Sequence, residues 1–345
     1  MVEYEYEASS LKKVDIDDNP EAVYSGHKPQ SGDVVAVRIS EVNESYRDLD
    51  LEGGELVELE KGDVVLGVLG NRSGVKGYIG EVPEQLEKDD LLDFLGSGGI
   101  FGSYVSGAKE LDEPCRAEFL GYLSKDGNIL NTLDFGIDHA EEVRSDAEIV
   151  AVVASRMDAG KTTLASNLIE RLSDHYEVAS VKFTGSARER DRLEMLEAGS
   201  VASLDFVDAG LPSTVEDRDL VVSAAKGLLN RIHQEHDVDV VVAEFGAGLI
   251  SNYRVKEVLS DLDVRERVSS VSAATLDVSG AYGLKNILED MDYQLDFVSG
   301  PITDTTVGRE TVETDLGVPA LNAFYQDQMD EAFEIISEQL DTEIQ

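Results

Sequence analysis

The stretch EIVAVVASRMDAGKTTLASNLIERL, residues 148–172, decides the fold. Residues 148–154 form an almost continuous apolar run, which is typical of a strand buried on both faces of a parallel sheet. Residues 161–172 carry three leucines at helical spacing, so we expect an amphipathic helix there. The stretch therefore predicts a strand, a short loop and a helix in direct succession.

The same alternation continues along the C-terminal part of the chain. Further strands are expected at 177–183, 238–245, 268–275, 295–300 and 318–321, and helices at about 190–197, 216–235, 253–261, 282–290 and 326–340. Alternating strands and helices over some 200 residues favour a doubly wound α/β domain with a mostly parallel sheet.

The N-terminal part has a different texture. Short β-rich runs alternate with turn residues, as in DVVAVRISEV from Asp33 and CRAEFLGYL from Cys115. This spacing is typical of a small barrel or sandwich. With a length that suggests about two domains, we expect a polar segment at 1–30, a β-rich domain of unknown role at 31–140 and the α/β domain at 147–345.

The charge balance excludes several classes of protein. The chain has 71 acidic and 29 basic residues, so its formal charge is 29 − 71 = −42. Such an anionic chain would repel a phosphate backbone or an anionic membrane surface, which argues against general nucleic-acid or lipid binding. Because 42% of the residues are hydrophobic, the chain can bury a core, and disorder is not expected.

The acids are spread through nearly every block of ten residues, and lysine is scarce. This pattern is typical of a haloarchaeal protein, whereas an acidic face for a basic partner would concentrate the charge in one segment. No apolar stretch reaches the roughly 18 residues that cross a bilayer, and the first residues lack the features of a signal peptide. The lone Cys115 cannot form an internal disulfide. We expect a cytoplasmic protein.

The loop after the first α/β strand carries the main motif. The phosphate-loop pattern is G-x-x-x-x-G-K-[ST], and this sequence fits it except that a serine replaces the first glycine. The strand before it and the helix after it supply the required context. The sequence thus predicts a nucleotide-binding loop composed of Ser155, Arg156, Met157, Asp158, Ala159, Gly160, Lys161, Thr162 and Thr163.

The chemistry of phosphate assigns roles within this loop. Backbone N–H groups and the positive end of the following helix would face the β-phosphate. Lys161 would span the β- and γ-phosphates, the Thr162 hydroxyl would bind Mg²⁺, and Thr163 is a candidate for the α-phosphate. The alternative suggested by Ser155 is a degenerate loop that binds nothing.

A second candidate group stands at the end of the strand VVVAEF. Glu244 supplies a carboxylate where a magnesium ligand is needed beside a phosphate loop. Gly246, Ala247 and Gly248 follow and would keep the backbone close to a ligand. The alternative is an ordinary strand end with a charge and a turn.

Together these motifs resemble the signal recognition, MinD and BioD class of P-loop proteins. This class includes dethiobiotin synthetase, cobyrinic acid amidases, partition ATPases and the GTP-binding protein of molybdopterin dinucleotide assembly. The resemblance covers about residues 147–340. Dethiobiotin synthetase has E-G-A-G at the corresponding strand end, whereas here Phe245 is inserted after Glu244. The resemblance implies magnesium-dependent chemistry on ATP or GTP, a catalytic role for Lys182 and metal binding by Asp191.

Other parts of the pattern depart from this class. Partition ATPases carry a lysine that reaches across a dimer; here Arg156 stands at that position, but Met157 and Asp158 replace the glycines. Arg156 acts across a homodimer or is simply exposed to solvent. The guanine-specific N-K-x-D is missing.

The class usually reads the base with the loop after a late strand. The candidates there are Gly300, Pro301, Thr303 and Asp304. Asp304 could accept a hydrogen bond from guanine, or the backbone could hold adenine, so the base stays open.

Two functions from different classes follow. The first is a magnesium-dependent NTPase or NTP-dependent ligase that activates a carboxylate-type metabolite, as in cofactor biosynthesis. The second is a nucleotide-dependent switch or assembly factor whose partner protein binds the β-rich domain. An enzyme should turn over faster with the right metabolite, whereas a switch should hydrolyse slowly and change its partner state.

Overall fold

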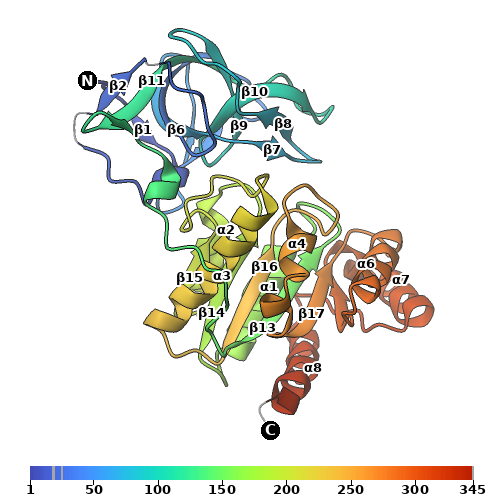
Figure 1. The fold of residues 1–345 in the computed structure, drawn as a ribbon. Coiled ribbons are helices and arrows are strands. Elements are labelled where there is room, and N and C mark those ends of the chain that lie inside the picture. Colours follow the sequence, from blue (N-terminus) through green and yellow to red (C-terminus); the bar gives the residue numbers. More distant parts are fainter. Residues whose placement is uncertain (18–19, 25, 344–345) are drawn as a thin grey trace. The chain divides into compact units, whose positions relative to one another are not determined.

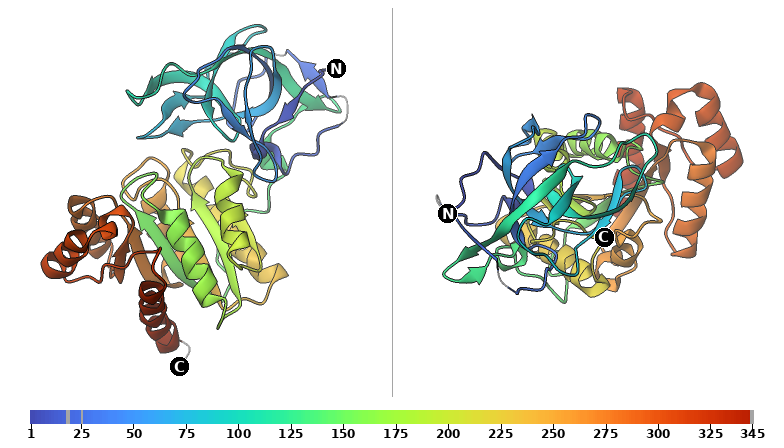
Figure 2. Two further views of the ribbon diagram at one scale, coloured as in Figure 1. Left: turned by 180° about the vertical axis from the view of Figure 1, so that it is seen from behind. Right: turned by 90° about the horizontal axis from the view of Figure 1, so that it is seen from above.

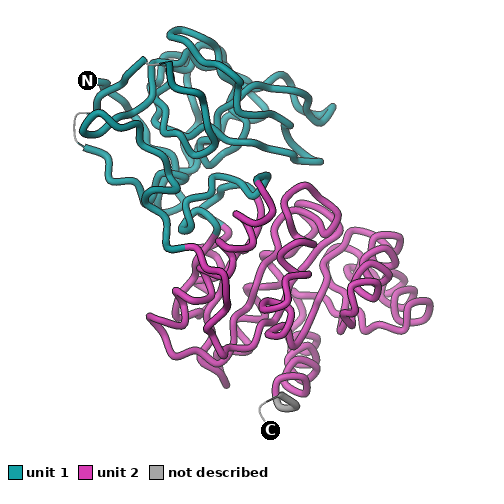
Figure 3. Tube along the Cα trace, viewed as in Figure 1, with its two compact units in different colours: residues 1–138, 186–190, 206–216 teal, residues 139–185, 191–205, 217–345 magenta. Residues whose placement is uncertain are grey.

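The structure, a computed structural model, describes residues 1–17, 20–24 and 26–343. The chain divides into two compact units that are not contiguous in sequence (Figure 3). Unit 1 combines residues 1–138 with two later segments, 186–190 and 206–216, and unit 2 holds the rest. Both later segments fall inside the range 147–345 that the sequence assigned to the α/β domain.

Unit 2 is built on a parallel sheet with the strand order β15-β14-β16-β13-β17-β18 (Figure 1). The strands are β13 (Glu148–Ala154), β14 (Val178–Thr184), β15 (Ser203–Asp205), β16 (Val240–Phe245), β17 (Val268–Ala274) and β18 (Phe297–Ser299). The helices in this half of the chain are α1 (Lys161–Leu172), α2 (Glu189–Glu197), α3 (Arg218–Glu235), α4 (Val255–Leu259), α5 (Leu262–Arg265), α6 (Val278–Asp290), α7 (Thr306–Thr311) and α8 (Gln326–Glu343), with short turns η3 (Pro301–Asp304) and η4 (Val312–Leu316).

One apolar cluster holds helices α1 and α8 against the sheet. Val150 of β13 and Val242 of β16 are fully buried there with Leu168 of α1 and Ile336 of α8. Successive strand residues point to opposite faces, yet every residue of β14 and β16 is buried. Burial on both faces explains the continuous apolar runs. It agrees with the central place of the paired strands β13 and β16 in the sheet.

Unit 1 is built on strands whose pairings close into a ring. β3 pairs antiparallel with β6 and β11, β9 pairs antiparallel with β11 and β10, and a parallel pair between β6 and β10 completes the circle (Figure 2). The strands of this unit are β1 (Tyr6–Glu7), β2 (Glu21–Val23), β3 (Val34–Glu41), β4 (Asp48–Asp50), β5 (Leu56–Glu58), β6 (Val64–Leu69), β7 (Arg72–Ser73), β8 (Tyr78–Glu81), β9 (Leu91–Gly96), β10 (Ile100–Gly107), β11 (Arg116–Lys125) and β12 (Asn128–Ile129), with turns η1 (Ser9–Leu11) and η2 (Thr132–Asp134).

Apolar side chains fill the ring. Val37, Phe94, Phe101 and Phe119 are almost completely buried in one cluster. Gly67 of β6 admits this packing, because a Cβ there would lie only 2.5 Å from the carbonyl oxygen of Gly99 and 2.6 Å from the Phe101 ring. The absence of a side chain at this position thus allows the parallel pair to close the ring.

Several predicted elements need correction. The expected strand at 318–321 forms only an isolated bridge between Ala320 and Val298, since Pro319 has no N–H for a ladder. The expected helix at 253–261 is shorter, Val255–Leu259, and Asp261 caps a separate helix that begins at Leu262. The segment 1–30, expected to be polar, contributes β1 and β2 to the sheet of unit 1.

None of the helices in the described part of the chain combines the length and the apolar character that crossing a bilayer requires.

Candidate functional site

The loop between β13 and α1 has an unusual backbone. Asp158 has a φ of 56° and Gly160 a φ of 95°, in the left-handed region that non-glycine residues rarely adopt. Gly160 is the residue that precedes α1. The loop therefore turns sharply and delivers the first turn of α1, whose N–H groups lack partners within the helix, to the carboxyl edge of the sheet.

Lys161 is buried although it carries a charge. Its side-chain nitrogen donates hydrogen bonds to the carbonyl oxygens of Ala247 at 2.8 Å and Arg156 at 3.3 Å. Burial lowers the pKa of Lys161, while the charge of Glu244 opposes this shift. The side chain thus lies between the loop and the segment that follows β16.

Glu244 stands in the middle of the same edge. In the sheet register it is paired with Val152 of β13 and with Lys182 of β14. Thr162 of α1 donates a side-chain hydrogen bond to its carboxylate, and burial raises the pKa of this carboxyl. Its Oε2 atom is buried and has no hydrogen-bond partner among the residues that the structure describes.

Lys182 and Asp191 form an ion pair beside Glu244. Burial alone would lower the pKa of Lys182, but the charges of Asp191 and Glu244 outweigh it and raise this pKa. Asp191 is on the first turn of α2, the helix that follows β14. The carboxyl ends of three neighbouring strands therefore bring together two lysines and two carboxylates.

The loop after β18 lies against the loop between β13 and α1, residues 155–160, which we call the phosphate-type loop. A Cβ on Gly300 would come within 2.5 Å of the carbonyl oxygen of Ala159 and 2.8 Å of that of Thr275. Thr303 is buried and its hydroxyl donates to the carbonyl of Gly300 at 2.7 Å. Two of its residues, Pro301 and Asp304, are exposed.

Several residues that sequence reasoning did not single out complete this region. Asn322 is buried and donates from Nδ2 to Asp304 Oδ1 at 3.0 Å. Thr275 donates to the hydroxyl of Ser155 at 3.2 Å. Asn322 directly follows the apolar run 318–321, so a polar residue after an apolar run was the signal that could have found it.

The remaining predicted residues lie around the loop with less specific contacts. Arg156 is half-buried and its Nε donates to the carbonyl of Met157 at 3.2 Å. Asp158 is exposed, and the carbonyl of Thr163 accepts from Asn167 Nδ2 at 2.8 Å within α1.

The donor atoms fit a magnesium ion that is shared with a nucleotide. The unpartnered Oε2 of Glu244 and the hydroxyl of Thr162 are oxygen ligands of the kind Mg²⁺ prefers. In residues 1–17, 20–24 and 26–343, no group of three or more His, Cys, Asp or Glu side chains forms a metal cage. Mg²⁺ usually keeps waters and is held by one or two carboxylates plus substrate phosphates, so the small protein donor set is compatible with it.

Comparisons with known proteins give matches to solved structures alone. No protein-family model matches the chain, and no curated protein matches its sequence. The structures that match include a plasmid partition protein from Borrelia burgdorferi (12% identity, 57% of this chain and 100% of that chain, TM-score 0.40), chloroplast FtsY from Physcomitrella patens (16%, 59% and 70%, 0.38) and the signal recognition particle 54 kDa protein from Aeropyrum pernix in complex with GDP (17%, 58% and 50%, 0.36). Each likeness covers little more than half of this chain.

Proposed function

We propose that unit 2 binds ATP or GTP together with Mg²⁺ and hydrolyses it or transfers its γ-phosphoryl group. The observation that supports this most directly is that the charge of Glu244 acts on buried Lys161 at the start of α1, while Glu244 Oε2 has no hydrogen-bond partner among the described residues. Burying such charges lowers stability unless they are paired and hydrogen-bonded. Perturbed pKa values in one cluster indicate a functional site.

The roles follow from position. Lys161 and the first N–H groups of α1 neutralise the β- and γ-phosphate oxygens. Thr162 and Glu244 would hold the metal ion, which when bound would stabilise charge on the phosphate oxygens. The Ala247 and Arg156 carbonyls accept hydrogen bonds from Lys161, and a phosphate oxygen would compete with them for this donor.

Lys182 and Asp191 mark the place of the second reactant. Lys182 is buried and its pKa is raised, so it stays positively charged near neutral pH. It would orient an anionic acceptor, such as a carboxylate-type metabolite in cofactor biosynthesis, beside the transferring phosphoryl group. Asp191, held by Lys182, would contribute a carboxylate to the metal site.

The base would lie against the loop from Gly300 to Asp304. The close approach of Gly300 to Ala159 supports this placement, since it shows that the loop adjoins the phosphate-type loop. Asp304 has one oxygen held by Asn322, which orients the carboxylate to read a donor edge such as that of guanine, while the backbone of the same loop would suffice for adenine. Arg156 would act on a second copy of the chain if the protein dimerises.

A titration of each nucleotide with and without Mg²⁺ tests the function. Lys161→Ala should weaken binding about 100-fold, the loss expected when a charge-assisted contact disappears. Lys256→Ala removes an exposed lysine and serves as the control. Calorimetry in molar KCl is suitable, because salt screens the repulsion of a chain with charge −42. A wild type that binds neither nucleotide, or a Lys161→Ala variant that binds as the wild type does, contradicts the proposal.

A second candidate is a nucleotide-dependent switch. It is favoured by one observation, namely that the segments following β14 and β15 belong to unit 1. A switch would hydrolyse slowly and alter the partner state of unit 1, whereas an enzyme would accelerate on addition of its metabolite. Turnover measured with and without candidate carboxylates separates the two functions.

A further inference from the structure

The chain passes through unit 1 between two residues of the nucleotide site. Residues 186–190 belong to unit 1, whereas Lys182 and Asp191, which form an ion pair, belong to unit 2. Helix α2 begins at Glu189 and contains Asp191 on its first turn. Glu189 and Asp191 therefore lie in the same turn of helix, so the position of Glu189 constrains the position of Asp191.

Unit 1 holds the segment 186–190 by backbone and side-chain contacts. The N–H of Glu189 donates to Asp50 Oδ2 at 2.6 Å, and the N–H of Ala187 donates to the carbonyl of Pro212 at 3.0 Å. The Glu189 carboxylate pairs with Lys12 at 3.3 Å. These contacts specify where the first turn of α2 starts.

Lys12 joins this segment to the other one. Its side-chain nitrogen lies 3.1 Å from Asp208 Oδ2, and Asp208 belongs to the segment 206–216. The side chains of Lys12, Glu189 and Asp208 are only 6%, 2% and 6% exposed. Because water is largely excluded, these charges interact more strongly than a surface pair would.

The third carboxylate of the group is Asp50. It accepts from the Ser9 hydroxyl at 2.9 Å as well as from Glu189, and burial raises its pKa. We call Ser9, Lys12, Asp50, Glu189 and Asp208 the Lys12 seat. Lys13 also pairs with Asp208, at 3.4 Å, but its side chain is 44% exposed. Removing the buried Lys12 would therefore weaken the charge compensation of Glu189 and Asp208.

We propose that the segment 186–190 is a strap through which unit 1 positions Asp191 and Lys182, so that seating of the strap and binding of a magnesium nucleotide are coupled. This inference rests on the proposed nucleotide function. Lys12 and Glu189 act as positioning residues, since they reach the site only through the first turn of α2. Coupling is reciprocal. Loosening the seat weakens binding of the nucleotide, and bound nucleotide slows hydrogen exchange in the strap.

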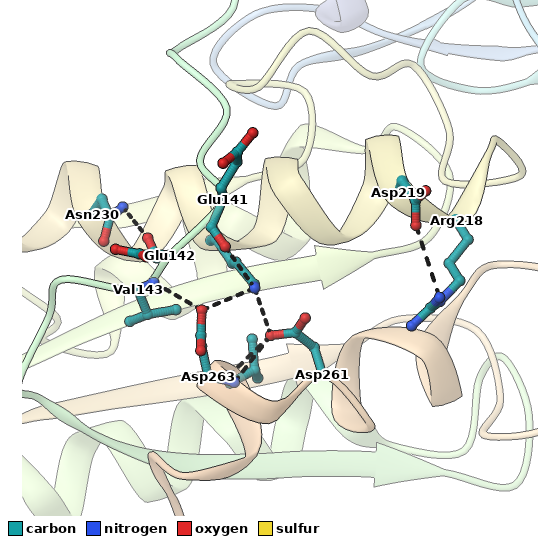
Figure 4. Close-up of polar contacts among 10 residues, drawn as sticks. Glu141, Glu142, Val143, Arg218, Asp219, Asn230, Asp261 and Asp263 are labelled. Atoms are coloured by element: carbon teal, nitrogen blue, oxygen red, sulfur yellow. Dashed lines mark hydrogen bonds and ion pairs between the residues drawn. The ribbon is translucent and has the colours of Figure 1, made fainter.

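The chain offers a matched control for this idea. In unit 2, Lys226 of α3 lies 2.9 Å from Asp261 and 3.0 Å from Asp263, with its side chain 9% exposed. Figure 4 shows Asp261 and Asp263 beside Glu141, Glu142 and Val143, and the Glu141 carbonyl also accepts a hydrogen bond from Lys226 at 2.9 Å. It is the same arrangement of one buried lysine between two carboxylates, and its partners Glu141, Asp261 and Asp263 are not residues of the proposed nucleotide site.

The experiment compares Lys12→Met with Lys226→Met in the full chain. Both variants should lower the unfolding temperature. Lys12→Met alone should weaken binding of the magnesium nucleotide about 10-fold, within the range of typical coupling. In the wild type, the magnesium nucleotide should slow hydrogen exchange in the peptide 186–197, and this protection should be lost in Lys12→Met and kept in Lys226→Met.

Glu189→Gln is the second variant if Lys12→Met does not fold. It removes the charge but keeps the size of the side chain and the backbone hydrogen bond to Asp50, so it should weaken binding in the same direction. If nucleotide affinity and strap protection match the wild type in these variants while Lys161→Ala still loses binding, the coupling is wrong and the nucleotide function stands. A wild type that binds no nucleotide overturns both.

Discussion

The interior of the ring in unit 1 and the carboxyl edge of the sheet in unit 2 are both buried, but they are filled in opposite ways. The ring holds Phe94, Phe101 and Phe119 among other apolar side chains. The edge holds Lys161, Lys182 and Glu244, each less than a tenth exposed. One region excludes charge and the other collects it.

The difference shows what each region is selected for. Moving a charge out of water costs several kcal/mol, and ion pairing compensates it only with good geometry. An apolar filling is therefore the cheaper way to stabilise a fold, and a buried charged cluster indicates that binding or chemistry uses the charges. Substitutions in the ring should change stability, whereas substitutions at the edge should change ligand binding and turnover.

The largest effect on stability is expected for Phe94→Ala. The side chain packs against Phe101, with ring centroids 5.6 Å apart, and is fully buried. Its truncation should lower the free energy of unfolding by about 3–5 kcal/mol, measured by urea denaturation, while the folded fraction binds nucleotide as before. Leu91→Ala on the same strand, where the side chain is 54% exposed, should have little effect. Equal losses in the two variants would break the comparison.

Glu244→Gln tests the other region. The substitution keeps the shape but removes the charge beside Thr162 and the two lysines. It should lower the magnesium-dependent rate of nucleotide hydrolysis about 100-fold, as expected when one group that stabilises developing charge is lost. Phosphate release measures the rate, and thermal unfolding provides the control. A rate equal to that of the wild type would remove Glu244 from the site.

Two glycines sharpen the comparison of packing. Gly67→Ala would place a methyl group against Gly99 and Phe101 and should lower stability by about 1–3 kcal/mol. Gly283 is in α6, and a Cβ there meets no atom within 4 Å. Gly283→Ala should raise stability by about 0.5–1 kcal/mol. Chemical denaturation measures both, and a Gly67→Ala variant as stable as the wild type would contradict the packing of the ring.

The smallest effect is expected for a buried carboxyl that affects stability and has no role in the proposed site. Asp296 accepts from the Ser270 hydroxyl at 2.8 Å and from the Val271 N–H at 2.9 Å, and burial raises its pKa above the ordinary 3.8 in spite of these hydrogen bonds. The native state therefore binds the proton more tightly than the unfolded state. This contribution to stability is fully present below the unfolded pKa and is lost as the pH rises through the native pKa.

The stability of the wild type relative to Asp296→Asn should accordingly increase as the pH falls from 7 to about 4, by about 1 kcal/mol at most. Urea denaturation of both proteins across this pH range measures the difference. A difference that stays constant, or that grows toward neutral pH, would contradict the shift.

The sequence was sufficient where local pattern decides the structure. The strand Glu148–Ala154 and the helix Lys161–Leu172 have the predicted bounds, because an apolar run and helical spacing of leucines are local signals. The proximity of Lys161 and Glu244 follows from the rule that the carboxyl ends of parallel strands lie at one edge of the sheet. β15, Ser203–Asp205, was missed because it contains a single apolar residue, Leu204, and so shows no apolar run.

The sequence was insufficient where distant residues decide the structure. Lys12 and Glu189 are 177 positions apart, and neither shows a pattern that points to the other. The assignment of 186–190 and 206–216 to unit 1 depends on such pairs. Asn322 was missed for a related reason, since its hydrogen bond to Asp304 joins two loops that are separate in sequence.

The discontinuous make-up of unit 1 limits how this protein can be divided. A fragment that ends at residue 138 would lack Glu189 and Asp208 and would leave Lys12 buried without these two carboxylates. A gene cut at that point would divide unit 1 between two products, and the second product would carry unit 2 together with two segments of unit 1. Recombination that exchanges one half for a homologous half would have to preserve this charge match, so the two halves should be inherited together.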